Sequence, residues 1–94
     1  MTVKTSFKLV VAEDHELVRQ GLVYTLKEAG YDVVGEASDG QQAIVCTKDQ
    51  TPDIVLMDIG MPNMDGISAT QEIKKTMPST KVVMLTSHDN PEEV

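Results

Sequence analysis

The regular alternation of short apolar runs with longer segments is the feature that most constrains how this chain can fold. Four such runs lie at residues 7–12, 32–37, 53–57 and 81–85. The segments between them are all longer than the dozen residues that a crossover between parallel strands needs, whereas a hairpin needs far fewer. The order β-α-β-α-β-α-β therefore predicts an α/β fold with a parallel sheet covered by helices. The run DIVLM at 53–57 predicts a strand that is buried on both faces.

The first intervening segment, residues 15–29, has the spacing of an amphipathic helix. Val18, Leu22 and Leu26 follow one another at intervals of four residues, which predicts that they form the face of the helix toward the core. Gly30 stands where a helix commonly ends in a glycine.

The other two helices are predicted over residues 39–49 and 67–77. Ser38 precedes Gln41 by three residues, a spacing that predicts a capping box with Ser38 at the N-cap. Pro78 follows the last of these helices, at a place where a helix normally stops.

The composition is typical of one small globular domain. The 94 residues are 40% hydrophobic and include 8 basic and 15 acidic side chains, for a formal charge of −7. No apolar run approaches the roughly 20 residues that span a bilayer, and no secretory leader opens the chain, so we expect a cytoplasmic protein without a membrane partner. The acidic excess argues against direct binding of nucleic acid, because phosphate contacts need clustered Lys and Arg. The single cysteine, Cys46, cannot form an internal disulfide.

Polar residues directly follow three of the four apolar runs. Glu13 and Asp14 follow the first run, Asp58 follows the third, and Thr86 and Ser87 follow the fourth. In a parallel sheet these positions share the carboxyl edge, where ligands of open α/β sheets bind at the point at which the strand order reverses. If the order is 2-1-3-4, the reversal falls between the first and third strands, which brings Asp14 and Asp58 together.

Three carboxylates in one crevice indicate a site for a cation. They repel one another and raise one another's pKa, and a hard divalent cation such as Mg²⁺ relieves that repulsion. With the hydroxyls of Thr86 and Ser87 beside them, the assembly suits phosphoryl transfer to an aspartate oxygen. Each residue alone has a simpler interpretation: Asp14 could cap a helix, Glu13 could be a solvated acid, and Asp58 could form a turn. Their arrival at one sheet edge favours the common site.

Three stretches of the chain carry a resemblance to a known family. They are VVAEDHELVRQGL, DIVLMDIGMPNMDGI and KVVMLTS, and the second is the most specific. Over residues 7–94 the chain resembles the receiver domain of a two-component response regulator. The resemblance implies a flavodoxin-like fold, in which the sheet order of the family begins 2-1-3-4.

The resemblance also implies roles for individual residues at the carboxyl edge. Asp58 would be the phosphoacceptor, which takes a phosphoryl group from a phosphohistidine of a sensor histidine kinase. Asp14 and Asp58 would bind Mg²⁺ directly, Glu13 would act largely through water, and the backbone carbonyl of Gly60 would complete the protein ligands. Thr86 would be the switch hydroxyl that turns toward the phosphate.

Two further features of the resemblance concern the switch and the output. Ser87, after the switch threonine, is small and would leave the phosphate reachable. The stretches DIGMP and SHDNPEEV are most similar to regulators that carry a C-terminal helix-turn-helix DNA-binding domain, so we expect an output in transcription.

The family pattern continues beyond this chain with a fourth helix, a fifth strand bearing a characteristic lysine, and a fifth helix. Asn90 and Pro91 suit the start of a helix. The resemblance therefore implies that residues 1–94 form a receiver domain truncated at the start of helix 4, with strand 5 missing. The strand at 81–85 would then be an exposed edge with apolar neighbours such as Val83. We expect it to associate as a homodimer or by exchange of elements between two chains.

Two other functions stay open on the sequence. One is a Mg²⁺-dependent hydrolase that also forms an aspartyl phosphate, although such enzymes typically need a second Asp where this chain has Gly60. The other is a receiver-like interaction module that is not phosphorylated. We expect a regulatory phosphoacceptor rather than an enzyme, with only slow self-phosphorylation from small donors and slow self-dephosphorylation.

Overall fold

The computed structural model describes residues 7–61 and 66–85, and these residues alternate between strands and helices as predicted. Each element lies within about a residue of its expected place. The elements are β1 (Lys8–Ala12), α1 (Glu16–Glu28), β2 (Asp32–Ala37), α2 (Gly40–Gln50), β3 (Ile54–Asp58), α3 (Gly66–Thr76) and β4 (Lys81–Leu85). No helix in these residues is both long enough and apolar enough to cross a membrane.

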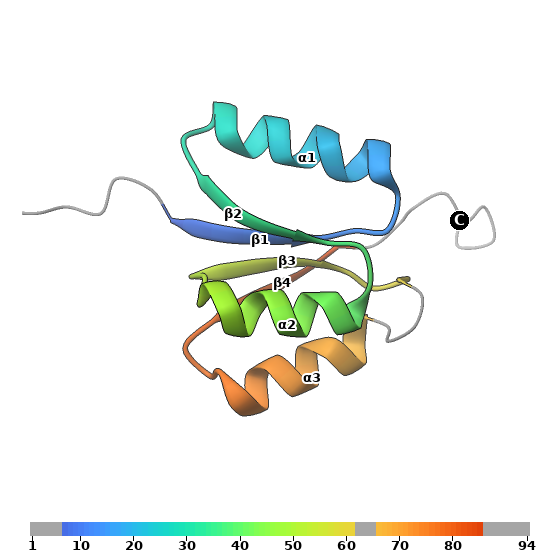
Figure 1. Cartoon of the computed structure of the whole chain (residues 1–94), viewed down its shortest axis with the longest axis vertical. Helices are drawn as coiled ribbons and strands as arrows, with labels where there is room; N and C mark the ends of the chain where they lie inside the picture. The colour runs from blue at the N-terminus through green and yellow to red at the C-terminus, as the bar shows by residue number, and fades with distance from the viewer. Residues whose placement is uncertain (1–6, 62–65, 86–94) are drawn as a thin grey trace, which may run out of the picture.

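The four strands form one parallel sheet in the order β2-β1-β3-β4, which confirms the predicted order. Ala12 at the end of β1 lies opposite Ala37 of β2 on one side and Met57 of β3 on the other. Helix α1 covers one face of the sheet, and α2 and α3 lie together on the other face (Figure 1). The strand order reverses between β1 and β3, so their carboxyl ends meet side by side.

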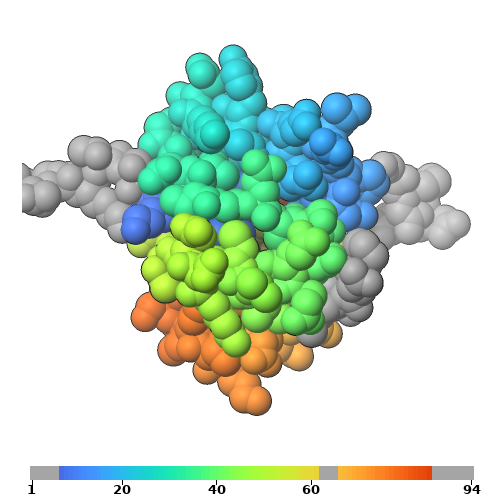
Figure 2. Space-filling model, in the orientation of Figure 1, coloured from blue at the N-terminus to red at the C-terminus, as the bar shows by residue number. Residues whose placement is uncertain are grey.

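The core lies between the sheet and the α2–α3 layer. Side chains from every second strand position fill it together with inward residues of the two helices, and the largest fully buried ones among them are Met57, Ile73, Val10 and Val55. In the space-filling view, α2 (green to yellow-green) crosses the middle of the molecule in direct contact with the α3 side chains below it (Figure 2). This layer holds β1 and β3 in place from one face.

The prediction that β3 is buried on both faces is wrong in part. Val55 and Met57 are fully buried, but Ile54 and Leu56 on the opposite face are only half-buried. The reason is that α1 contacts β1 and β2, and within residues 7–61 and 66–85 no helix covers β3 and β4 on that face.

The predicted apolar stripe of α1 is wrong in part. Leu22 and Leu26 are half-buried, but Val18 is 51% exposed, and the most buried side chain of the helix is Val23, at 8% exposed. Arg19 points inward instead: its Nη1 donates to the carbonyl oxygen of Glu13 at 2.9 Å and its Nε donates to Glu36 Oε1 at 3.0 Å. These two polar contacts bind α1 to the loop after β1 and to β2, and they decide which side of the helix faces the sheet.

The capping box of α2 is displaced by one residue from its predicted place. Asp39, not Ser38, is the N-cap, and its Oδ1 accepts from the backbone N–H of Gln42 at 2.8 Å. The side chain of Gln42 reaches back and accepts from the backbone N–H and the hydroxyl of Ser38, each at 3.0 Å. Both Ser38 and Asp39 are good N-cap residues, and the pairing of Asp39 with Gln42 satisfies more backbone donors.

Strand β4 is the edge of the sheet within the described residues, as predicted. Val83 on this strand is 46% exposed, and Leu85 is half-buried. The outer side of β4 is therefore an apolar sheet edge.

Candidate functional site

Asp58 is the last residue of β3 and lies at the carboxyl edge of the sheet. It is only 2% exposed. The chain after it is held by two backbone hydrogen bonds, from Ile59 N–H to the Leu85 carbonyl at 3.1 Å and from Gly66 N–H to the Ile59 carbonyl at 3.0 Å. These bonds place the turn after Asp58 between β4 and the start of α3.

Gly66 is a site-building residue whose role the sequence reasoning missed. A Cβ at this position would collide with the carbonyl oxygen of Asp58 and lie 2.8 Å from the Cα of Ile59. Only a glycine lets the first residue of α3 approach the backbone at Asp58 this closely. The available signal was its place at a fixed distance after Asp58 in the stretch DIVLMDIGMPNMDGI.

Glu13 and Asp14 reach the same edge from the end of β1. The register pairs Ala12 with Met57, so the residues that follow, Glu13 and Asp58, leave the sheet as neighbours. Glu13 is 5% exposed, and its backbone N–H donates to the Ala37 carbonyl at 2.9 Å. The side chain of Asp14 is 26% exposed. The structure therefore brings together the three carboxylates that the sequence predicted would meet.

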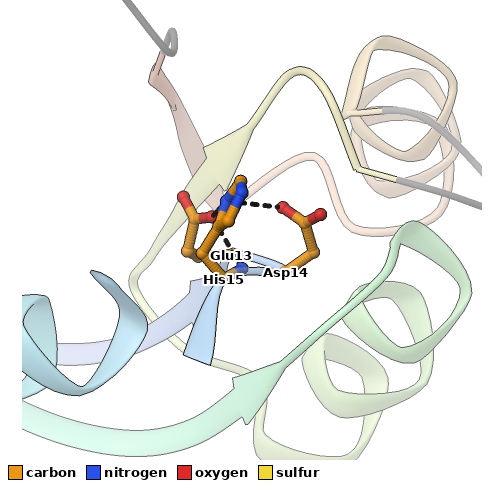
Figure 3. A group of neighbouring side chains, drawn as sticks. All are labelled: Glu13, Asp14 and His15. Carbon is orange, nitrogen blue, oxygen red and sulfur yellow. Dashed lines mark hydrogen bonds and ion pairs between the residues drawn. The ribbon is translucent and has the colours of Figure 1, made fainter. Parts of the chain in front are cut away.

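His15 makes contact with both acids of the pair. Its ring atom Nδ1 lies 3.0 Å from Glu13 Oε2 and 3.4 Å from Asp14 Oδ1, so the imidazole lies between the two carboxylates (Figure 3). The backbone N–H of His15 also donates to Glu13 Oε2, at 2.9 Å. His15 is the N-cap residue of α1, without a side-chain cap hydrogen bond, so the alternative role of Asp14 as the helix cap is wrong.

The electrostatics of the site follow from burial and from the crowding of negative charge. The pKa of Asp58 is raised, first by burial and then by the charges of Glu13 and Asp14, while the N–H of Gly60, 3.3 Å from Asp58 Oδ1, opposes the rise. The pKa of the exposed His15 is raised, chiefly by its hydrogen bond to Glu13 and then by the charge of Asp14. The repulsion that the sequence predicted is therefore present at Asp58.

The donor set of this edge fits Mg²⁺. Glu13, Asp14 and His15 each offer a ligand atom within 4.8 Å of the others. Asp58 lies outside this group, but it is near enough that the charges of Glu13 and Asp14 raise its pKa. Asp14 Oδ1 is shielded from solvent and has no hydrogen-bond partner in the described part of the chain. A buried carboxylate oxygen without a donor is costly, and a hard cation that prefers oxygen ligands satisfies it.

The contacts described above do not test the predicted roles of three site residues. Gly60 lies in the turn after Asp58, and its N–H contacts that side chain, but its carbonyl as a metal ligand stays a prediction. Thr86 and Ser87 lie outside the described residues, so their switch roles also stay predictions. The helix expected to start near Asn90 lies outside them as well.

Relatives of known sequence match most of this chain. A VraR response regulator from Staphylococcus saprophyticus is 44% identical over 88 residues, which are 93% of this chain and 42% of the relative. A VraR protein from Staphylococcus aureus is 43% identical over 95% of this chain and 43% of its own length. The chain thus spans less than half the length of the curated relatives that it matches.

Solved structures of similar shape are receiver domains. The signal receiver domain of a NarL response regulator from Mycobacterium tuberculosis has a TM-score of 0.85 and 36% identity, covering 95% of this chain and 73% of that one. CheY of Borrelia burgdorferi, in a complex with CheX, BeF3 and Mg²⁺, has a TM-score of 0.83 and 27% identity, over 94% of this chain and 67% of that one.

The family of this chain is identified by a match that covers most of its length. Residues 9–94 match the family described as the response regulator receiver domain. The acidic pair after β1 and the aspartate that ends β3 lie within this match. The chain therefore belongs to the response-regulator receiver domain family and has its flavodoxin-like α/β fold.

Proposed function

We propose that this chain is a phosphoacceptor domain in which Asp58 takes a phosphoryl group from the phosphohistidine of a sensor histidine kinase. The observation that carries the proposal is the place of Asp58, buried at the carboxyl end of β3 beside Glu13 and Asp14. In the transfer, a carboxylate oxygen of Asp58 forms a bond to phosphorus while the bond from phosphorus to the histidine nitrogen breaks. Membership of the receiver family supports this assignment.

The same proposal assigns the metal ligands. Asp14 and Asp58 would hold Mg²⁺ directly, Glu13 through water, and the carbonyl of Gly60 would complete the protein ligands. The bound ion would neutralise the charge that builds up between the acids and the phosphoryl oxygens. Support comes from the buried Oδ1 of Asp14, which accepts no hydrogen bond within the described residues, and from the oxygen-rich donor set.

The switch and output complete the proposed function. Phosphorylation adds about −1.5 to −2 charges, and the new oxygens need donors. We assign that role to the Thr86 hydroxyl, with the small Ser87 leaving the phosphate reachable, and the shift biases a two-state surface. Because similar solved structures include a DNA-binding LuxR-family regulator from Staphylococcus aureus, we place this domain in a cytoplasmic response regulator with a helix-turn-helix output that controls transcription.

The test is incubation with Mg²⁺ and acetyl phosphate, followed by mass spectrometry of the intact protein. We expect one added phosphoryl group, which disappears in the Asp58→Asn variant and when EDTA removes the metal. Asp53→Asn is the matched control, because Asp53 adjoins the opposite end of the same strand, and it should be phosphorylated normally.

Other outcomes of this experiment would identify the rival functions. Rapid release of inorganic phosphate without a stable adduct would indicate the Mg²⁺-dependent aspartyl-phosphate hydrolase. A folded protein that never gains phosphate would indicate the interaction module. An adduct that persists in Asp58→Asn would contradict the assignment of the phosphoacceptor.

We also propose that this chain forms a homodimer, or exchanges elements with a second copy, through the outer edge of β4. The exposed Val83 and the half-buried Leu85 support this association. Light scattering across a concentration series should show dimers, and Val83→Lys should shift them to monomers. Val45→Lys is the control, because Val45 is as exposed but lies on α2. A monomer at every concentration would contradict the association.

A further inference from the structure

We propose that, when no ion is bound, the imidazole of His15 contacts the carboxylates of Glu13 and Asp14 that would bind the metal. The ring must then rotate away from them for Mg²⁺ to bind. His15 is then a positioning residue that lowers the Mg²⁺ affinity of the site. The inference rests on the proposed function, because it assumes that Glu13 and Asp14 are the residues that receive the metal.

The first argument is competition for the lone pairs of Glu13. Each oxygen of an ionised carboxylate offers about two acceptor positions. Both positions of Oε2 are taken by His15, one by its backbone N–H at 2.9 Å and one by its ring Nδ1 at 3.0 Å. This oxygen can accept a water of the Mg²⁺ shell only if one of these donors leaves.

The second argument concerns Asp14. Its Oδ1 has no hydrogen-bond partner within the described segments, and the ring Nδ1 of His15 lies 3.4 Å away from it. Mg²⁺ requires a distance of about 2.0–2.1 Å to each oxygen and a full octahedral shell. The ring therefore lies beside Asp14 Oδ1, the buried oxygen that a cation would satisfy, and between the carboxylates of Glu13 and Asp14 (Figure 3).

The third argument is that the ring is free to move, whereas the backbone donor is not. The side chain of His15 is 67% exposed, and it makes no cap hydrogen bond to α1. A rotation about its side-chain bonds releases both acids without disturbing the helix. The backbone N–H of His15 stays on Glu13 and keeps that carboxylate oriented toward the site.

The test measures the Mg²⁺ dissociation constant by calorimetry at one fixed pH for the wild type and three variants of His15. In His15→Ala the competing donor is gone, and we expect binding to tighten roughly three- to tenfold, which corresponds to the net contribution of one typical hydrogen bond because the exposed ring is also solvated by water. His15→Asn keeps an N–H donor at the position of Nδ1 and should bind like the wild type. His15→Gln moves the donor one atom outward and should tighten binding as alanine does.

A matched control and a second measurement distinguish the loss of the His15 donor from a general structural effect of changing α1. Gln20→Ala removes another exposed polar side chain of α1, whose Nε2 donates to Glu16 Oε2 at 3.1 Å, and it should leave the affinity unchanged. In the wild type, Mg²⁺ should shift the ring resonances of His15 in the NMR spectrum toward those of a free imidazole.

The outcomes separate this inference from the proposed function. Equal or weaker Mg²⁺ binding by His15→Ala, in a wild type that binds Mg²⁺, would overturn the role of His15 alone. Tightening by His15→Asn as large as that by His15→Ala would overturn the assignment to Nδ1. A failure of every protein to bind Mg²⁺ would overturn the proposed metal site and the inference with it.

Discussion

Two aspartates flank β3, and their surroundings are opposite in character. Just before the strand, Asp53 accepts from the backbone N–H of Lys8 at 2.8 Å through Oδ2, and its own N–H donates to the Lys8 carbonyl at 2.8 Å. At the last residue of the strand, Asp58 accepts a long hydrogen bond of 3.3 Å from Gly60 and lies beside the charges of Glu13 and Asp14.

The difference shows that the polar groups at the two edges of the sheet have different roles. The polar groups at the amino edge are satisfied by the backbone, as in the bond from the buried Thr80 hydroxyl to the Pro52 carbonyl at 3.0 Å, and they stabilise the fold. The carboxyl edge concentrates negative charge, and at Asp58 only the long hydrogen bond from Gly60 offsets burial and the charges of Glu13 and Asp14. That arrangement lowers stability, and a bound cation is the kind of partner that relieves it.

Gly66→Ala should have the largest effect on stability, because the added methyl group would clash with backbone atoms at the carboxyl edge. The new methyl group meets the carbonyl of Asp58, which cannot rotate away, so we expect a loss of about 1–3 kcal/mol in the free energy of unfolding. Urea unfolding measures it. Gly35→Ala is the control: its methyl group meets the Sγ of Cys46, a side-chain tip that can turn, and the loss should be smaller. Equal losses would contradict the special role of Gly66.

Asp53→Ala should show that the amino-edge aspartate is structural. Removal of the acceptor for the Lys8 N–H should lower the free energy of unfolding by about 1–2 kcal/mol while phosphorylation on Asp58 continues. Urea unfolding and the acetyl phosphate assay, run on the same sample, check both halves. A variant that keeps full stability would remove the contrast between the two aspartates.

Asp58→Asn should act in the opposite direction and stabilise the protein at neutral pH by less than about 1 kcal/mol. The folded-state pKa of Asp58 lies above the ordinary 3.8, so the wild type gains stability as the pH falls through that raised pKa. The advantage of the variant should therefore be present at neutral pH and vanish in acid. Thermal melts of both proteins between neutral and acidic pH measure it, and a destabilised variant would contradict the repulsion.

The smallest effect is the titration of His15, whose side chain is exposed. Its pKa should lie above 6.5 in an NMR titration and fall in Glu13→Gln, because the hydrogen bond to Glu13 is the main cause of the rise. A raised histidine pKa adds stability below its unfolded value, and that contribution is lost as the pH rises through the folded value. An unchanged pKa in Glu13→Gln would show that another charge dominates.

Much of this architecture was predictable because it depends on local pattern. Parallel strands need crossovers of about a dozen residues or more, which these segments supply, and a polar residue after a strand of a parallel sheet lies at its carboxyl edge. That logic placed Asp58, Glu13 and Asp14 at one edge, and the strand order 2-1-3-4 then made them neighbours. The strand order and the phosphoacceptor role came from the family resemblance, and the structure confirms the order.

The errors arose where particular side-chain contacts and the packing of neighbouring elements, rather than residue type or periodicity, decide the outcome. The periodicity of α1 made Val18 an inward residue, but the bonds of Arg19 to Glu13 and Glu36 turn the helix. Ser38 and Asp39 are equivalent as caps by residue type, and the reach of Gln42 chose between them. Burial of β3 depends on which helices cover each face, which its own five residues do not encode.

The sequence by itself determined the alternation of strands and helices and the acids at the strand ends, because hydrophobic period and chain length are local properties. Only the tertiary structure decided that Gly66 touches the backbone at Asp58 and that Asp58 lies beside Glu13 and Asp14. These arrangements depend on packing across the sheet edge, where distances of a few tenths of an ångström choose between a contact and a clash.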